Sequence, residues 1–318
     1  MVALLSGVQE RLQERIGPLR AWLFPQRVYL QLEDQAITAM ALDGRRIIWL
    51  ERVDLPVGLI EQGDPVRVDA LGDLLGDLFV ERGFAGALVS AVLPPVASQM
   101  RLVQWPEGCW PDDPERTLVL NEEQLALKVS LQYLDIHLLE LDREPPTSLV
   151  VTVPSSTLDK WIEVFVFAGL SLARMEASKL CVCRGAQPLL TGQGVTAVVQ
   201  LERQRSSLMV LEDALPVFEH RLPGAEHPRL LQDELKRALA FWSALRPDLG
   251  APVLLLHGAA LSDDDQAAAL SETLGCTSQL LDPLAHGWLM DVSPDFGLHP
   301  EGSALAVLWG LAAAEVLA

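Results

Sequence analysis

Few side chains in this sequence have the type and spacing that chemistry requires. Three consecutive acids at 263–265 are of the kind that holds divalent cations, but acids at a helix start more often face solvent and stabilise the positive end of the helix dipole. The six histidines and four cysteines lie scattered, and none completes the spacing of a zinc site. No Gly-x-Ser-x-Gly frame surrounds the hydroxyls of residues 155–157, which suit a helix start. We therefore expect neither a metal site nor a catalytic residue.

The balance of charge excludes several classes of ligand. Among 318 residues, 24 are Lys or Arg and 43 are Asp or Glu, so the net charge is −19. Nucleic-acid binding draws its affinity largely from Lys and Arg, which are in the minority in this chain. Neither a signal peptide nor an apolar run of about 20 residues, the length that spans a bilayer, is evident. The sequence thus predicts a cytoplasmic globular protein that binds no nucleic acid.

Residues 1–27 form a separate segment, for which we expect an amphipathic helix. Its apolar side chains recur at the helical period with charged residues between them. The apolar positions are Leu4, Leu5, Val8, Leu12, Ile16, Leu19 and Leu23. Such a helix most often packs on the body of its own protein or on a partner, and a membrane surface is the alternative.

A repeat divides the rest of the chain into two related halves. The tripeptide Gln-Leu-Glu at 31–33 recurs at 200–202, an offset of 169 residues, inside equivalent predicted hairpins. Without a gap, the same register places Leu42 on Leu211. Because strand, turn and second strand agree together, the chain reads as two copies of one α/β unit.

The order of the predicted elements is that of an α/β protein, since helices alternate with apolar strands. We expect strands at 28–42 (a pair), 46–53, 87–93, 99–103, 133–141, 148–153 and 253–256, and helices at 69–82, 155–169, 230–245, 263–274 and 303–317.

This layout resembles the actin-like ATPase fold, and within it the sequence is similar to the type IV pilus assembly family PilM, a relative of the cell-division protein FtsA. The similarity covers nearly the whole chain from residue 28 onward and rests on the order and spacing of elements. Its strongest segments are 101–106, 149–170, 255–261, 280–284 and 304–307. The resemblance implies two ribonuclease-H-like halves with a small α/β subdomain inserted in the first. On that template, the first half is 28–85 plus 148–190, the inserted subdomain is 86–147, and the second half is 195–318.

The nucleotide-binding loops of the family are poorly kept. Where the family has Asp and, two positions on, Gly in its first phosphate loop, this chain has Gln31 and Glu33. Gln200 and Glu202 stand at the corresponding places of the second loop, and Gly258 is a remnant of the glycines of the third. A carboxylate repels phosphate, and a side chain blocks the approach of backbone NH groups. We expect a pseudo-ATPase that binds ATP weakly or not at all, ATP with magnesium being the disfavoured alternative.

The resemblance also implies a partner. Proteins similar to PilM bind the short cytoplasmic N-terminal peptide of a PilN-like bitopic inner-membrane protein, in a groove beside the inserted subdomain. By position, Arg101, Trp105 and Lys160 are the candidate peptide contacts, with core packing as the alternative for Trp105. The protein is then expected to be a cytoplasmic scaffold that reaches the inner membrane through its partners and ties a type IV or competence pilus complex to its motor.

Two other hypotheses stay open. One is the cytoplasmic domain of a type II secretion protein of the L type, and the other is a working actin-like ATPase. The second would need an acidic residue in the first strand, where Gln31 stands. Self-association and the task of the pilus, whether DNA uptake, motility or adhesion, are left undecided by the sequence.

Overall fold

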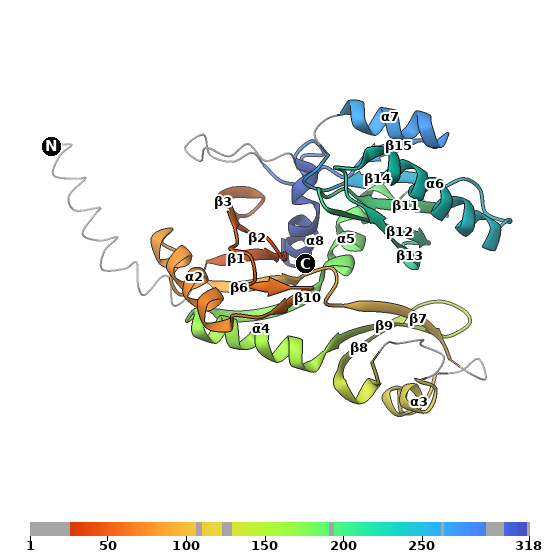
Figure 1. Ribbon diagram of the computed structural model, residues 1–318. Coiled ribbons are helices and arrows are strands. Elements are labelled where there is room, and N and C mark those ends of the chain that lie inside the picture. Colours follow the sequence, from red (N-terminus) through yellow and green to blue (C-terminus); the bar gives the residue numbers. More distant parts are fainter. Residues whose placement is uncertain are drawn as a thin grey trace.

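Three sheets organise the protein, as the computed structural model shows (Figure 1). The structure describes residues 26–105, 110–122, 129–190, 194–261, 264–290 and 302–316, so the expected N-terminal helix lies almost wholly outside the described residues. Two sheets have five strands each and one has three, with a ribbon formed by β4 (Ile60–Glu61) and β5 (Asp64–Pro65) beside the first. Within these ranges, no helix is both long enough and apolar enough to cross a membrane.

The first five-stranded sheet has the order β10-β6-β1-β2-β3. Its antiparallel part is the expected meander of β1 (Arg27–Leu32), β2 (Ala36–Asp43) and β3 (Arg46–Asp54). β6 (Leu88–Leu93) runs parallel to β1, and β10 (Ser171–Ala177) runs parallel to β6. Each parallel connection passes through a helix, as parallel strands require.

The second five-stranded sheet repeats this arrangement with the order β13-β12-β11-β14-β15. Its meander consists of β11 (Val195–Gln200), β12 (Arg205–Glu212) and β13 (Leu215–Pro223), and β14 (Val253–His257) and β15 (Ser278–Leu280) add the parallel strands.

The two meanders agree residue by residue, which confirms the predicted repeat. Gln31 pairs with Thr38 across the first hairpin, and Gln200 pairs with Ser207 across the second, both displaced by 169 positions. Even the irregularities coincide, because the register shifts between Ala41 and Leu42 in β2 and between the equivalent residues of β12. The duplicated halves of the predicted fold are therefore real structural units.

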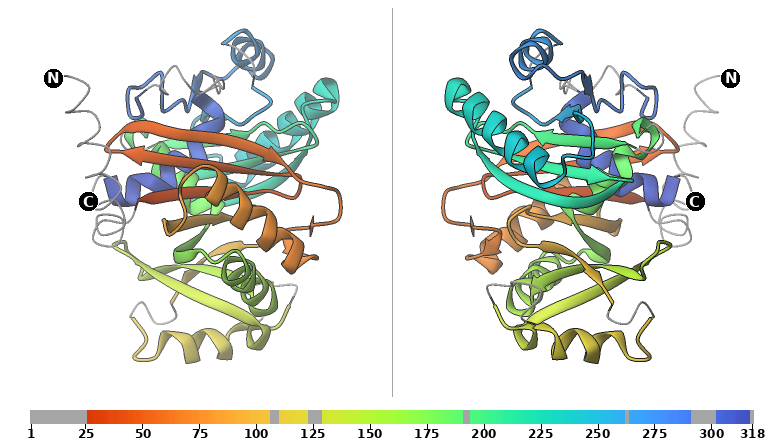
Figure 2. Two further views of the ribbon diagram at one scale, coloured as in Figure 1. Left: turned by 90° about the vertical axis from the view of Figure 1, so that its left-hand side faces the viewer. Right: turned by 90° about the vertical axis from the view of Figure 1, so that its right-hand side faces the viewer.

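Helices cover the outer faces of both large sheets (Figure 2). On the first sheet lie α2 (Val68–Glu81) and α4 (Ser155–Phe167), and on the second lie α6 (Pro228–Leu245) and α7 (Asp264–Leu274). Strand residues alternate between faces, so Leu30 packs with the α2–α4 layer while its neighbour Tyr29 packs in a central cluster. Three short 3₁₀ turns occur at Leu131–Tyr133, Gln187–Leu189 and Gly302–Leu305.

The central cluster joins the halves through α5 (Ser178–Ala186) and α8 (Ala306–Val316), which lie between the two sheets. Their backbones approach so closely that a Cβ at Gly310 would overlap the carbonyl oxygen of Cys181, and one at Gly185 would lie 3.1 Å from the carbonyl oxygen of Ala306. Small residues therefore set the distance between the helices. Neither β10 nor α5 is among the expected elements, although both are central to the fold.

A partly buried ionic cluster ties the end of α8 to the first sheet. The Glu315 carboxylate forms an ion pair with Arg27 and accepts hydrogen bonds from Tyr29 Oη at 3.1 Å and Ser90 Oγ at 3.2 Å. Arg174 Nη2 of β10 lies 3.4 Å away on the same carboxylate. Burial opposes ionisation of Glu315, but the hydrogen bond and charge of Arg27 outweigh it and hold the pKa below its ordinary value. Burial, then the Glu315 charge, raises the pKa of Tyr29 to about 12.

The inserted subdomain is a separate three-stranded sheet with the order β7-β9-β8. It consists of β7 (Gln99–Gln104), β8 (Leu134–Leu141) and β9 (Thr147–Pro154), together with α3 (Pro114–Leu120). Its small core holds Trp105, Leu118, Leu131 and Val150.

The subdomain boundaries differ from the expected 86–147 at both ends. β6 pairs with β1 and β10, so it belongs to the first large sheet, and the insertion starts after residue 93. β9 lies between β7 and β8, so the insertion continues to residue 154. The second half, expected as 195–318, also reaches back into the first, because α8 packs on α5 and places Glu315 beside β1.

The contact between α5 and α8 can be tested by adding one methyl group. We expect Gly310→Ala to lower the free energy of unfolding by about 3 kcal/mol or more, because overpacking at a backbone contact forces the helices apart. Urea unfolding of both proteins measures the difference. Gly250→Ala is the matched control, since nothing lies within 4 Å of the Cβ it would add. An unfolding midpoint for Gly310→Ala equal to that of the control would contradict the close packing.

Candidate functional site

The equivalent hairpins of the two halves meet where an actin-like protein would hold its nucleotide. Gln35, at the β1–β2 turn, donates from Nε2 to Gln204 Oε1 at the β11–β12 turn, over 3.1 Å. These two residues are also 169 positions apart, so a single contact joins the same position of each half. The two turns therefore touch directly at this point.

In the first loop, neighbouring side chains pair with one another, although the buried Oε1 of Gln31 has no hydrogen-bond partner among the described residues. Gln31 is 7% exposed, and its Nε2 donates to Glu33 Oε1 at 2.8 Å. Glu33 also forms an ion pair with Arg52 at 2.9 Å. Asp34 points away to accept a hydrogen bond from the backbone of Gly63 at 2.8 Å. The guanidinium of Arg52 is thus already paired with the carboxylate of Glu33 in the loop itself.

The second loop repeats the pattern. Gln200 Nε2 lies 3.4 Å from Glu202 Oε1, which also accepts a hydrogen bond from the backbone NH of Ala259 at 3.3 Å. Burial is the largest influence on Glu202, and the charge of Glu33 on the facing loop adds to it, so that together they raise the pKa of Glu202 to about 7. Two carboxylates therefore face each other between the halves.

The third loop closes onto the second. Gly258 has φ +118°, and a Cβ there would lie 2.8 Å from the backbone nitrogen of Leu201 and still nearer to its carbonyl oxygen. Glycine is therefore required for packing between loops. The NH of Gly258 donates to the carbonyl of Ser303 at 3.2 Å, and the NH of Ala260 donates to that of Leu201 at 3.0 Å. Burial lowers the pKa of His257 to about 4, so this side chain is neutral at pH 7.

These features do not fit a nucleotide phosphate. Phosphate is held by backbone NH groups that point at it and by cations. In this chain, the NH groups of residues 258–260 donate to protein oxygens, and Glu33 and Glu202 place negative charge at the first two loops. The hollow beside Gln200, lined also by Lys179, Glu219 and His257, has a volume of about 40 Å³, whereas small-molecule sites usually exceed ~300 Å³.

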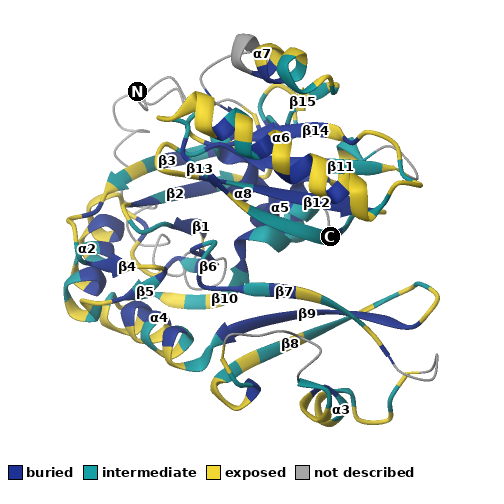
Figure 3. Cartoon of the chain, turned by 45° about the vertical axis from the view of Figure 1, so that its right-hand side comes forward, coloured by how far each residue is buried: buried dark blue, intermediate teal, exposed yellow. Residues whose placement is uncertain are grey.

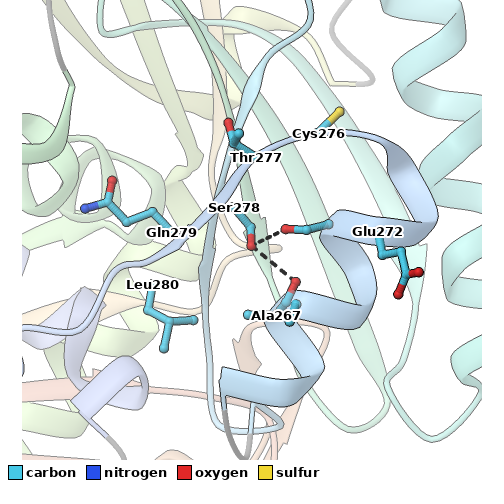
Figure 4. A pocket seen from close by; sticks show the side chains of 9 residues that line it. Ala267, Glu272, Cys276, Thr277, Ser278, Gln279 and Leu280 are labelled. Atoms are coloured by element: carbon cyan, nitrogen blue, oxygen red, sulfur yellow. Dashed lines mark hydrogen bonds between the residues drawn. The ribbon is translucent and has the colours of Figure 1, made fainter.

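The structure describes no alternative centre for metal chemistry. Within the described ranges, no group of three or more His, Cys, Asp or Glu side chains could hold a metal ion. Asp263 and the side chains of the two following acids lie outside what the structure describes. The larger hollow, about 710 Å³, lies between α7 and β15 on the flank of the second half (Figure 4). There the Ser278 hydroxyl donates to the carbonyl of Ala267 at 3.2 Å and accepts a hydrogen bond from the Ser271 hydroxyl. Both hydroxyls therefore hold α7 against β15.

The three candidate peptide contacts are not brought together. Trp105 is 4% exposed in the core of the small sheet, and its Nε1 donates to Ser148 Oγ at 3.0 Å, so the expected role of Trp105 as a peptide contact is wrong. Lys160 on α4 forms an ion pair with Asp64 of β5. Arg101 is exposed on β7, and within the described ranges it donates only to the neighbouring carbonyl of Met100, at 2.8 Å.

Comparison with known proteins places the fold. No protein-family model and no curated protein matches the sequence. Among solved structures, a chain of the PilM-PilN type IV pilus biogenesis complex aligns with a TM-score of 0.73 and 19% identity, over 91% of this chain and 98% of that one. The protein has the actin-like ATPase fold. The cytoplasmic domain of EpsL, an inner-membrane component of the type II secretion system of Vibrio cholerae, aligns with a TM-score of 0.51 and 14% identity, over 92% of this chain and 98% of that one.

Four members of this actin-like cleft are not among the predicted residues. Gln35 and Gln204 could have been found from the repeat, because the offset of 169 relates them. Arg52 shares the first meander with Glu33, but its pairing depends on the twist of β3 over β2. The backbone NH of Ala259 carries no sequence signal at all.

The raised pKa of Glu202 gives a pH-dependent stability. The folded state binds this proton more tightly than the unfolded chain, where a Glu titrates near 4.3, so the free energy of unfolding falls as pH rises from about 4.3 to about 7. Glu202→Gln keeps the acceptor oxygen without the charge. We expect the free energy of unfolding of Glu202→Gln to exceed that of the original protein by about 2 kcal/mol at pH 8 and by almost nothing at pH 4.

Denaturant unfolding across this pH range measures the effect. Glu272→Gln, at an exposed glutamate of α7 with no ion pair among the described residues, is the control and is expected to shift stability equally at both pH values. A constant difference between Glu202→Gln and the original protein from pH 4 to pH 8 contradicts the buried carboxylate.

Proposed function

We propose that the protein is an actin-like scaffold of a type IV or competence pilus machine, and that it binds the cytoplasmic N-terminal peptide of a PilN-like single-pass inner-membrane protein. The observation that carries this proposal is the close backbone similarity, over nearly the whole length of both chains, to a chain solved in a PilM-PilN complex. The TM-score describes the whole chain, and the inserted three-stranded sheet is one part of it. The peptide, the cytoplasmic location and the link to a pilus motor belong to the proposal.

The inserted sheet supports peptide binding by its construction. β7 is an edge strand of the small sheet, and edge strands have backbone groups with which an extended peptide can pair where no other element covers them. β13 of the second half lies against part of β7, and Met100 packs in the central cluster, so the peptide would pair with the uncovered part of the strand. Arg101 lies exposed on this strand, and no carboxylate in the described part of the chain forms an ion pair with it. Its guanidinium has donors left for a carbonyl or carboxylate of the peptide. Since the whole chain is acidic, a basic segment on the same partner would be attracted during docking.

We also propose that the protein binds ATP weakly or not at all and is not an ATPase. In support, the backbone NH groups of the third loop are satisfied by protein acceptors, and the first and second loops present Glu33 and Glu202. The contact of Gln35 with Gln204 replaces a ligand as the bridge between the loops. The cleft then acts as a fixed structural joint.

A second candidate function is that of the cytoplasmic domain of a type II secretion protein of the L type. The alignment with the EpsL domain, which covers 98% of that chain, favours it. Its lower TM-score places it behind the pilus scaffold. The two candidates differ in partner, so identifying the bound membrane protein separates them.

Titration calorimetry tests the absence of nucleotide binding. With ATP and magnesium, we expect no saturable heat and a dissociation constant above about 1 mM, weaker than about −4 kcal/mol. A nucleotide-binding actin-like ATPase in the same buffer serves as the positive control. A micromolar dissociation constant for this chain would overturn the proposed loss of ATP binding.

Affinity capture from detergent-solubilised membranes of the source organism tests the partner. We expect recovery of a small single-pass membrane protein of the PilN type, and at least about tenfold less of it with Arg101→Glu, because the substitution removes the guanidinium donors for the peptide and puts an acceptor in their place. The control, Arg205→Glu, changes an exposed arginine at the start of β12 and should leave recovery unchanged. Repeated failure to recover such a protein, or equal loss with both variants, contradicts the proposed interface.

A further inference from the structure

Several apolar side chains are exposed on α2 and α4, the two helices that cover the first sheet and whose outward sides hold many exposed residues (Figure 3). Val166 is 71% exposed and Phe167 is 55% exposed, both at the end of α4. Ile162 lies one turn earlier, and Val80 near the end of α2 is exposed as well. We call these four side chains the α2–α4 strip. Scattered exposed apolar residues are ordinary, but here they gather on one face of two adjacent helices.

The packing of the two helices brings the strip together. A Cβ at Gly72 of α2 would lie 2.5 Å from Cβ of Phe167, and one at Gly76 would lie 3.1 Å from the carbonyl oxygen of Ala168. Glycines thus let the end of α4 sit directly against α2, with Cβ of Phe167 at Gly72. This contact brings the exposed apolar residues of the two helices onto neighbouring surfaces.

Acidic side chains border the strip. On the exposed side of α2 lie Asp73 and Asp77, and on that of α4 lie Asp159 and Glu163. The one basic residue on these helices, Lys160, pairs with Asp64, and the arginines that flank α2 are paired as well, Arg67 with Asp69 and Arg82 with Glu51. The chemistry of the strip therefore suits an apolar helix face flanked by arginines.

The chain itself enters beside this strip. The carbonyl of Gln26 accepts a hydrogen bond from the NH of Leu88 at 2.8 Å, which fixes the start of the described chain at the beginning of β6. Ser171 pairs with the same Leu88 from the other side. Gln26 therefore lies only about 10 Å, or two strand spacings, from Ser171, which follows the last residue of α4 by four positions.

We propose that residues 1–16 dock as an amphipathic helix on the α2–α4 strip of their own chain. Sixteen helical residues span ~24 Å, close to the ~20 Å of the 13-residue α4. Gly17 and Pro18 interrupt the helical pattern that we expect over residues 1–27, so the proposed docked helix is limited to residues 1–16. The remaining residues up to 25 reach at most ~30 Å, which exceeds the distance from the chain entry to the strip.

Sequence and charge agree with this occupant. Leu5, Val8 and Leu12 form one face of the predicted helix, with Arg11 and Arg15 beside them. Residues 1–16 also contain Glu10 and Glu14, so their side chains carry no net charge, but helical spacing places these glutamates on the face opposite Leu5, Val8 and Leu12. The arginines beside the apolar face can therefore approach the acids along α2 and α4, whereas the net charge of −19 makes an anionic membrane a poor surface for the same segment. The inference stands apart from the proposed function, because it concerns a face that the peptide proposal does not use.

Hydrogen exchange of the full-length protein tests the docking. We expect the amides of residues 4–16 to exchange about tenfold or more slowly than in an unstructured peptide, without change over a twentyfold range of protein concentration. Val166→Asp should return these amides to the unprotected rate, because it places a charge in the strip at a position too exposed to affect folding. Leu120→Asp, at an equally exposed apolar residue of α3 (76% exposed), is the matched control and should leave the protection intact.

Each other outcome overturns the proposal. Protection that survives Val166→Asp shows that the segment packs elsewhere or is helical by itself. Protection that rises with concentration identifies a second copy as the occupant. Protection that appears only with vesicles of anionic phospholipid identifies a membrane surface. No protection at any concentration, with or without vesicles, shows that the segment stays undocked.

Discussion

The contact between α5 and α8 is the interaction on which the rest of the structure depends. α5 follows the last strand of the first sheet and α8 ends the second half, so their packing holds the two copies of the repeat in one orientation. Gly185 and Gly310 permit the contact, and the Glu315 cluster anchors the far end of α8 on β1, β6 and β10. Once this orientation is set, the equivalent hairpins must meet, and the chemistry between the halves follows from which residues stand at their turns.

At the turns of the two equivalent hairpins lies a symmetric set of glutamine amides and glutamate carboxylates. Each half contributes a Gln and a Glu two residues apart, and the tips are joined by Gln35 and Gln204. Burial of Glu202, followed by the charge of Glu33, opposes ionisation and raises the pKa of Glu202. Arg52 offsets part of the charge through Glu33. The fold thus retains the arrangement of an actin-like protein, while the side chains at its turns contact one another across the halves.

Much of the fold could be predicted because its signals are local or periodic. Strand alternation and the offset of 169 residues located both meanders, and even the coincident bulges agree with that offset. The ends of the insertion could not be found in this way, since β6 and β7 are both apolar strands and only long-range pairing decides which sheet each joins. α5 was missed because its residues, among them Cys181 and Val182, are buried by α8 and both sheets and show little amphipathic pattern. At the candidate site, Gln31, Glu33, Gln200, Glu202 and Gly258 were found from the repeat and the family resemblance, whereas the burial of Trp105 depends on a small core formed by residues 13 to 45 positions away.

The direct passage from β9 into α4 has a mechanical consequence. The strand ends at Pro154 and the helix begins at Ser155, so at this end of the insertion no linker residue separates the small sheet from the body of the protein. Tension applied to the small sheet would run along β9 into the axis of α4, where Trp161 is bonded to the backbone of Gly63 at 3.0 Å and the helix is wedged against α2. A force that a binding partner exerts on the inserted sheet would therefore be transmitted to the whole first half. The insertion would move with that half and would not rotate independently of it.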